Sequence, residues 1–191
     1  MYANKKERKY MSHLNPITYE EAQPEVKELF DALKKKMKMV PNIYATVANS
    51  PTVLKALLQF GENLKQGEFS HKEVEAIALA VSEENHCEYC LSAHTAVGKM
   101  VGFSEEETRN LRLAKSDDQK LQTLTALAKE IVHTKGYPSE STINEFFSAG
   151  YSKRALVDLI GFVALNVFTN YFNHIAQTKI DFPEAQSLVN R

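Results

Sequence analysis

Residues 70–100 read SHKEVEAIALAVSEENHCEYCLSAHTAVGKM, and helix signals run through the whole stretch. It begins with Ser70 and Glu73, which fit a capping box, and apolar residues then recur at helical spacing. The run SEENH at 82–86 is too polar for a buried helix, so it separates two helices. Asn85 is a natural N-cap for the second helix, which would begin directly before two cysteines.

Helix starts and stops recur along the rest of the chain, whereas strand signals are nearly absent. Capping boxes are repeated at Thr18–Glu21 and Ser104–Glu107, and Ser50 precedes a proline at the first helical position. Three glycines suit the left-handed position past a helix end: Gly102, Gly136 and Gly150. The predicted fold class is all-α, a multi-helix bundle with helices near 20–38, 41–48, 51–65, 71–83, 86–100, 105–114, 117–135, 140–149 and 153–177.

The last predicted helix is unusually apolar. Its stretch Ala155–Phe168 is interrupted by Asp158 and Asn166 and is shorter than the roughly 20 residues needed to cross a bilayer, so a buried helix is favoured. Because the helix is apolar on more than one face, we expect the bundle to cover one side and another subunit to cover the other. A homo-oligomer is therefore expected.

Length and charge limit the remaining possibilities. The 191 residues suggest a flexible N-terminal arm at 1–15 and a single domain at 16–191. Lys and Arg total 23 against 24 for Asp and Glu, so neither nucleic acid nor an anionic membrane is an expected partner. The N-terminus is basic but has no apolar segment behind it, so a secretory signal is not expected.

The only two cysteines, Cys87 and Cys90, form a CxxC, which indicates redox or metal chemistry in a reducing compartment and places the chain in the cytosol. On a helix, these residues and His94 fall within an arc of roughly 60°. A helix N-terminus and a neighbouring imidazole both lower a thiol pKa. We therefore assign Cys90 as the attacking sulfur, His94 as its proton acceptor or ion partner, and Cys87 as the resolving thiol.

Two other interpretations of the cysteines remain open. They could be a buried reduced pair that only packs, or they could bind zinc with His94 and either His86 or Glu75. Covalent haem is excluded because Leu91, not histidine, follows the second cysteine. We expect no metal and no organic cofactor.

Several polar residues near the motif have alternative roles. Glu75 either faces solvent or serves as a proton relay for the thiols. Tyr89 and His86 could form hydrogen bonds at the site, or they could be core and helix-start residues. His174, with Asn170 and Asn173, forms a polar cluster on the last helix, for which structural hydrogen bonding is favoured over pocket lining.

The spacing Glu75-x11-Cys87-x2-Cys90-x3-His94 resembles the signature of the alkylhydroperoxidase D-like, peroxidase-related branch of the carboxymuconolactone decarboxylase superfamily. The segments VPNIYATVANSPTVLKALLQF (40–60) and NYFNHIAQTKIDFP (170–183) also resemble that branch. The resemblance spans roughly residues 38 to 183. It implies an all-helical fold in which the Glu helix and the CxxC helix lie side by side, within a trimer or hexamer.

By position, the resemblance implies that Cys90 reacts with peroxide, that Cys87 is its disulfide partner, and that His94 and Glu75 belong to a proton relay. One position departs from the pattern, since alkylhydroperoxidase D itself has histidine where this chain has Tyr89. The decarboxylases of the superfamily lack the CxxC, so that activity is not expected.

The sequence thus predicts a thiol-dependent peroxidase that uses a hydroperoxide substrate and a thiol reductant. The alternative is a redox sensor or binding protein whose disulfide changes subunit contacts.

Overall fold

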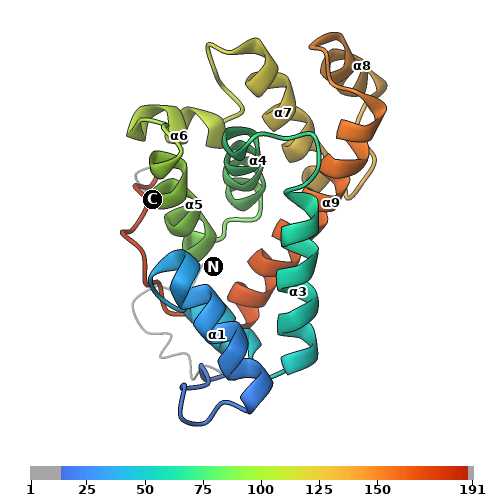
Figure 1. The fold of residues 1–191 in the computed structure, drawn as a ribbon. Coiled ribbons are helices and arrows are strands. Elements are labelled where there is room, and N and C mark those ends of the chain that lie inside the picture. The colour runs from blue at the N-terminus through green and yellow to red at the C-terminus, as the bar shows by residue number, and fades with distance from the viewer. Residues whose placement is uncertain (1–13, 189–191) are drawn as a thin grey trace, which may run out of the picture.

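The structure, a computed structural model, describes residues 14–188, and this part of the chain contains nine helices and no strand (Figure 1). The predicted all-α class is confirmed. The N-terminal arm predicted at 1–15 lies almost entirely outside the described residues. The helices are α1 (Pro24–Met37), α2 (Asn42–Val47), α3 (Pro51–Leu64), α4 (His71–Glu84), α5 (Glu88–Met100), α6 (Glu105–Arg112), α7 (Gln119–His133), α8 (Glu140–Ser148) and α9 (Lys153–Ala176).

Local capping chemistry explains where most helices begin. Both predicted capping boxes at α4 and α6 form, and Ser50 accepts a hydrogen bond from the Val53 amide at the start of α3. The prediction at Thr18–Glu21 is wrong as a helix start. Its reciprocal hydrogen bonds form, but they close a turn, and α1 begins later at Pro24. The reason is that Gln23 is extended, which interrupts the helical path before the proline.

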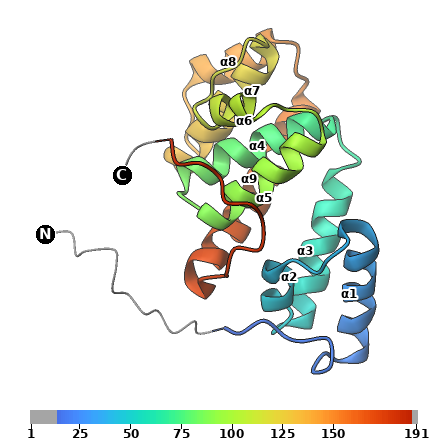
Figure 2. The same cartoon turned by 90° about the vertical axis from the view of Figure 1, so that its left-hand side faces the viewer.

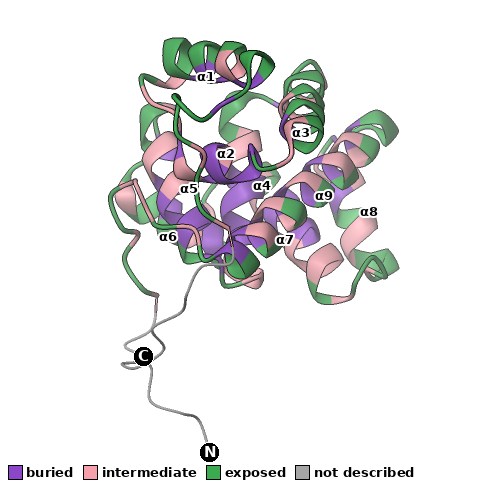
Figure 3. Cartoon of the chain, turned by 90° about the horizontal axis from the view of Figure 1, so that it is seen from below, coloured by how far each residue is buried: buried purple, intermediate pink, exposed green. Residues whose placement is uncertain are grey.

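Helix α4 is the centre of the fold. Every residue from Ala76 to Ser82 is buried, which requires cover on all sides and not along one stripe. Helices α5, α6, α7 and α9 provide this cover (Figure 1), and Figure 3 shows the buried surface concentrated around α4. The first turns of α4 are less enclosed, so polar side chains such as Glu75 lie at the edge of the core.

Helices α3 and α9 pack closely and run antiparallel. Gly61 lies against Leu165, and Gly161 lies against Leu64. A Cβ atom at Gly161 would approach Leu64 Cδ2 to 2.7 Å, so a larger residue there would require the Leu64 side chain to move. Besides its contact with α3, helix α9 also packs against α4 and α5.

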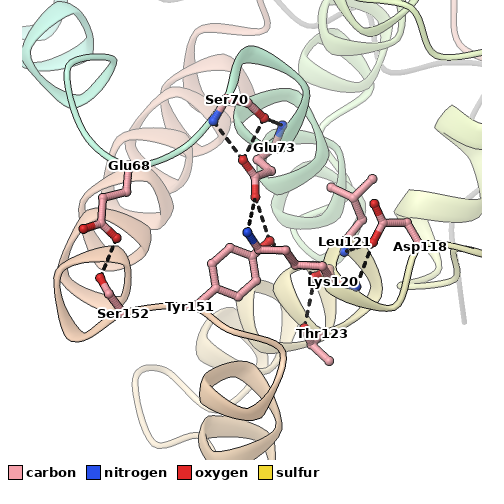
Figure 4. A network of polar contacts seen from close by, with 9 residues as sticks. All are labelled: Glu68, Ser70, Glu73, Asp118, Lys120, Leu121, Thr123, Tyr151 and Ser152. Atoms are coloured by element: carbon pink, nitrogen blue, oxygen red, sulfur yellow. Dashed lines mark hydrogen bonds and ion pairs between the residues drawn. The ribbon is translucent and has the colours of Figure 1, made fainter.

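A polar network ties the beginning of α4 to the beginning of α9 (Figure 4). The Tyr151 hydroxyl donates to Glu73 Oε1 at 2.9 Å, and Lys120 Nζ lies 4.6 Å from the centroid of the Tyr151 ring. Burial and the Glu73 carboxylate raise the pKa of Tyr151, so its hydroxyl stays protonated and remains a donor. Ser152 also donates to Glu68 at 2.5 Å.

The C-terminal segment 177–188 runs along the outside of α5 (Figure 2). The Ala185 amide donates to Ser92 Oγ at 3.1 Å, and the Phe182 ring packs edge-on against Tyr89. Arg112, buried and paired with a glutamate of α4, donates to the carbonyl of Gln186 at 2.7 Å. The segment therefore holds α5 from the side that carries Tyr89 and Ser92.

Helix α9 is long and apolar enough, by composition, to cross a membrane, and it is the one such helix among residues 14–188. In the structure it packs against α3, α4 and α7, as a core helix does. Large apolar side chains nevertheless remain exposed along its other side at helical spacing. This α9 outer face consists of Val157, Ile160, Phe168, Tyr171 and Ile175.

We propose that the α9 outer face is covered by another copy of the chain. Replacing Ile160 and Phe168 together by glutamate would place charges where apolar contact is needed, so we expect the oligomer to dissociate. Light scattering should give the mass of several chains for the natural protein and of one chain for the variant. As a control, Asn63→Glu with Gln66→Glu adds the same charge at exposed positions of the α3 end and should leave the mass unchanged. A natural protein with the mass of one chain would contradict the proposal.

Candidate active site

The cysteine pair lies at the beginning of α5, and Cys87 itself is the N-cap. Its Sγ accepts a hydrogen bond from the Cys90 amide at 3.3 Å. The predicted cap, Asn85, is wrong, because this residue ends α4. His86 then adopts a left-handed conformation with φ of 57°, which changes the direction of the chain. Cys87 follows in an extended conformation and becomes the N-cap of α5.

The two sulfurs are joined as a disulfide, with the Cα atoms 5.3 Å apart. Cys87 is 1% exposed and Cys90 is 2% exposed, within an apolar cluster that includes residues of α1, α2 and α3. The pair thus lies at the positive end of a helix, where a thiolate is stabilised. Burial in the apolar cluster acts in the opposite direction, because it disfavours the charged form.

Glu75 of α4 and His94 of α5 form a hydrogen-bonded pair. Nδ1 of His94 is 2.8 Å from Oε2 of Glu75, and the side chains are 27% and 13% exposed. A carboxylate can only accept, so the proton of a neutral imidazole lies on Nδ1. In that tautomer Nε2 carries no proton and can accept one, and the residue lies one helical turn beyond Cys90. Glu75 is thus paired with His94 and is not solvent-facing, whereas its role as a proton relay for the thiols stays a prediction.

Asn173 of α9 is the residue whose position the sequence did not reveal. Its Nδ2 lies 3.2 Å from Cys90 Sγ and 4.0 Å from Cys87 Sγ, and the side chain is 5% exposed. Asn166 and Asn170 precede it at helical spacing, and all three are buried. This spacing could have indicated from the sequence that the three asparagines face the core, because buried amides on one face of an apolar helix need hydrogen-bond partners there.

The other members of the predicted polar cluster have different surroundings. Asn170 donates to Ser82 and accepts from Asn85, so it joins α9 to the end of α4. His174 is exposed and stacks on the Tyr171 ring. Structural hydrogen bonding is thus the role of Asn170, whereas Asn173 reaches the cysteines.

Tyr89 and His86, the two residues considered as neighbours of the site, point elsewhere. The Tyr89 hydroxyl accepts from the Ile43 amide at 3.2 Å, and its ring packs on Phe182. Burial and the Asp181 carboxylate raise its pKa, so it stays protonated. His86 is exposed in the turn between α4 and α5.

The zinc set considered from the sequence is not assembled in this arrangement. Glu75 is engaged with His94, and His86 is exposed. Within residues 14–188, no group of three or more His, Cys, Asp or Glu side chains is placed to hold a metal ion.

Residues 51–136 match the model of the carboxymuconolactone decarboxylase family. These residues include α3, α4, α5 and the proposed site residues other than Asn173. No curated protein matches the chain.

Solved structures share the fold over most of the chain. A peroxidase-related protein from Silicibacter sp. TM1040 is 24% identical, with a TM-score of 0.75 over 87% of this chain and 92% of the other. An alkylhydroperoxidase AhpD core protein from Ralstonia eutropha JMP134 is 16% identical, with a TM-score of 0.79 over 90% and 91%. The debrominase Bmp8, in complex with 2,3,4-tribromopyrrole, is also 16% identical, with a TM-score of 0.78 over 90% and 92%. At these identities the comparison establishes an alkylhydroperoxidase D-like fold and leaves the substrate open.

The capping role of Cys87 can be tested under reducing conditions, where the disulfide is open. Cys87→Ala removes the acceptor at the N-cap, whereas Cys87→Ser retains one. We expect the free energy of unfolding of the alanine variant to be about 1 kcal/mol below that of the serine variant. Urea denaturation measures the difference.

Ala96 provides the control for this comparison, because it lies inside α5 and caps nothing. Replacing it by serine should bring no gain in stability. Equal stabilities of Cys87→Ala and Cys87→Ser would show that the cap is not energetically important.

Proposed function

We propose that the chain is a thiol-dependent oxidoreductase that reduces hydroperoxides, because residues 51–136 match the model of the carboxymuconolactone decarboxylase family and the chain has the alkylhydroperoxidase D-like fold. The observation that supports the proposal is that α5 begins with the Cys87–Cys90 disulfide and carries His94 one turn after Cys90, with His94 Nδ1 2.8 Å from Glu75 of α4. The superfamily contains enzymes, and the CxxC distinguishes this chain from its decarboxylases. The fold is also that of a debrominase, so the choice of hydroperoxide rests on the side chains and not on the fold.

The proposed chemistry begins with the Cys90 thiolate. It attacks the terminal oxygen of a hydroperoxide, so that an S–O bond forms and the O–O bond breaks. The alkoxide that leaves takes a proton and becomes an alcohol, and Cys90 becomes a sulfenic acid. The Cys87 thiol then displaces water from that sulfenic acid and forms the disulfide. An external dithiol reduces the disulfide and is itself oxidised.

His94 and Glu75 would move the protons in this sequence. With Nδ1 held by the Glu75 carboxylate, Nε2 can take the thiol proton and later deliver it to the leaving alkoxide. The carboxylate stabilises the imidazolium that forms in between, as an acidic partner does for other catalytic histidines.

The remaining parts of the proposal concern the setting of the enzyme. We place it in the cytosol, because thioredoxin- or glutathione-type thiols keep a CxxC reducible there. No metal or organic cofactor enters the proposed chemistry, and the α9 outer face provides the contact for a homo-oligomer.

A redox sensor is the second candidate, and the burial of the sulfurs favours it. At 1% and 2% exposure, the disulfide offers little surface to a protein reductant. A sensor would be oxidised once per site and would change its mass or its partner, whereas an enzyme consumes peroxide continuously in the presence of a dithiol. Turnover therefore distinguishes the two.

Serine variants of the two cysteines test the assigned roles. Cys90→Ser should abolish peroxide consumption in a dithiol-coupled assay, because the attacking sulfur is lost. Cys87→Ser should react once and accumulate a sulfenic acid on Cys90, because the resolving thiol is lost. Mass spectrometry after limiting peroxide identifies both species. Full activity of Cys90→Ser would refute the assignment.

The Glu75–His94 pair can be tested with a matched surface pair. Glu75→Gln keeps the shape but removes the negative charge, so we expect oxidation of the cysteines by peroxide to slow by about 100-fold. Glu84→Gln alters a similar contact, since Glu84 Oε1 is 2.9 Å from His133 Nδ1 on the surface. Stopped-flow measurement should give an unchanged rate for this control. Equal rates for both variants would remove Glu75 from the mechanism.

A further inference from the structure

Asn173 brings an amide to the cysteine pair from α9, a helix that the chemistry proposed above does not use. We propose that Asn173 is a catalytic residue of this site. Its amide N–H stabilises the Cys90 thiolate, and its carbonyl oxygen accepts the terminal O–H of the hydroperoxide that the thiolate attacks. The second of these roles rests on the proposed function, whereas the first holds for any chemistry of the thiol pair.

The donor role follows from the contact between Nδ2 and Cys90 Sγ, at 3.2 Å. Sulfur is a weak acceptor as a thiol or disulfide and a strong one as a thiolate, because hydrogen bonds to an ionised partner are stronger. A donor fixed at this sulfur therefore favours the charged form and lowers the thiol pKa. The donor is needed here, because the apolar cluster around the pair acts in the opposite direction.

The charged and titratable groups around the sulfur come from several helices. Helices α4 and α5 contribute the Glu75–His94 pair, and α5 also contributes the Cys87 thiol. Tyr44 of α2 packs against the apolar cluster that contains the cysteines, and burial with the Glu62 and Glu75 carboxylates raises its pKa, so that it stays neutral. From α9, Asn173 adds a donor without adding a charge.

The acceptor role follows from the other half of the same amide. Oδ1 of Asn173 is buried and has no hydrogen-bond partner within residues 14–188. An unpaired buried acceptor is destabilising, and a native structure retains few of them. Because Oδ1 and Nδ2 share one carbon atom, the unpaired oxygen lies beside the reactive sulfur.

A hydroperoxide matches this vacant acceptor. Its single donor is the O–H of the terminal oxygen, which is also the oxygen that the thiolate attacks. A hydrogen bond to Oδ1 would hold that oxygen next to Cys90 Sγ while the O–O bond breaks. The sulfenic acid that forms keeps the same O–H, so the contact survives the step.

The donor role is tested in a Cys87→Ser background, which leaves Cys90 as the single thiol and retains an N-cap acceptor. Thiolate absorbance and iodoacetamide alkylation are followed against pH. We expect Asn173→Leu and Asn173→Ala each to raise the pKa of Cys90 by about one unit, a ten-fold loss of thiolate below the pKa. Two uncharged substitutions are used, because alanine needs no extra space if leucine does not fold.

Asn166→Leu is the matched control for buried amides of α9. Asn166 is 6% exposed, and its Nδ2 donates to the Phe162 carbonyl at 2.8 Å, not to a sulfur. The pKa of Cys90 should be unchanged in this variant. An unchanged pKa in both Asn173 variants would overturn the donor role.

The acceptor role is tested at a pH where Cys90 is fully ionised in every variant. We expect Asn173→Leu to lower the rate constant with tert-butyl hydroperoxide by about ten-fold. The rate with methyl methanethiosulfonate, a thiol reagent without an O–H or N–H group, should be unchanged. Equal losses with both reagents, or no loss with either, would overturn the acceptor role.

The two proposals fail in different ways. A chain that reacts with no hydroperoxide refutes the proposed function and the acceptor role, while the pKa of Cys90 still decides the donor role. A chain that turns over hydroperoxide, with Asn173 variants that match the natural protein in both measurements, refutes this inference and leaves the proposed function standing.

Discussion

The burial of α4 on all sides is the constraint on which the rest of the structure depends. A helix with no solvent-facing stripe between Ala76 and Ser82 must be enclosed, and α5, α6, α7 and α9 enclose it. Because α5 and α9 both pack on α4, side chains from the three helices meet at its edges. Glu75, the cysteine pair and Asn173 are those side chains. The candidate site is thus a geometric result of covering one apolar helix.

Most of the fold was predictable because helix ends are determined by neighbouring residues. The cap at Ser70 and the proline after Ser50 act over three or four positions, so the sequence contains their whole cause. The two errors show where that locality ends. Thr18 and Glu21 form the hydrogen bonds of a capping box, but no helix begins there. Cys87, not Asn85, is the N-cap of α5, because the backbone reverses direction at His86.

The candidate site was predictable only in part. Cys87, Cys90 and His94 lie on one stretch, and Glu75 entered through the spacing of a family signature. Asn173 is 83 residues from Cys90, and its contact depends on the antiparallel packing of α9 against α3 and on its passage along α5. No local rule gives such a register. The hydrogen bond of the Tyr89 hydroxyl could not be predicted either, because its partner is a backbone amide of α2.

The position of these elements along the chain has a consequence for biosynthesis. Asn173 and the segment that holds α5 through Ser92 and Tyr89 are synthesised after both cysteines. Until they are made, the nascent polypeptide carries both thiols without the amide from α9 and without the support that segment 177–188 gives to α5. The cysteine pair therefore acquires its mature environment only after α9 and this segment have left the ribosome, long after the thiols themselves.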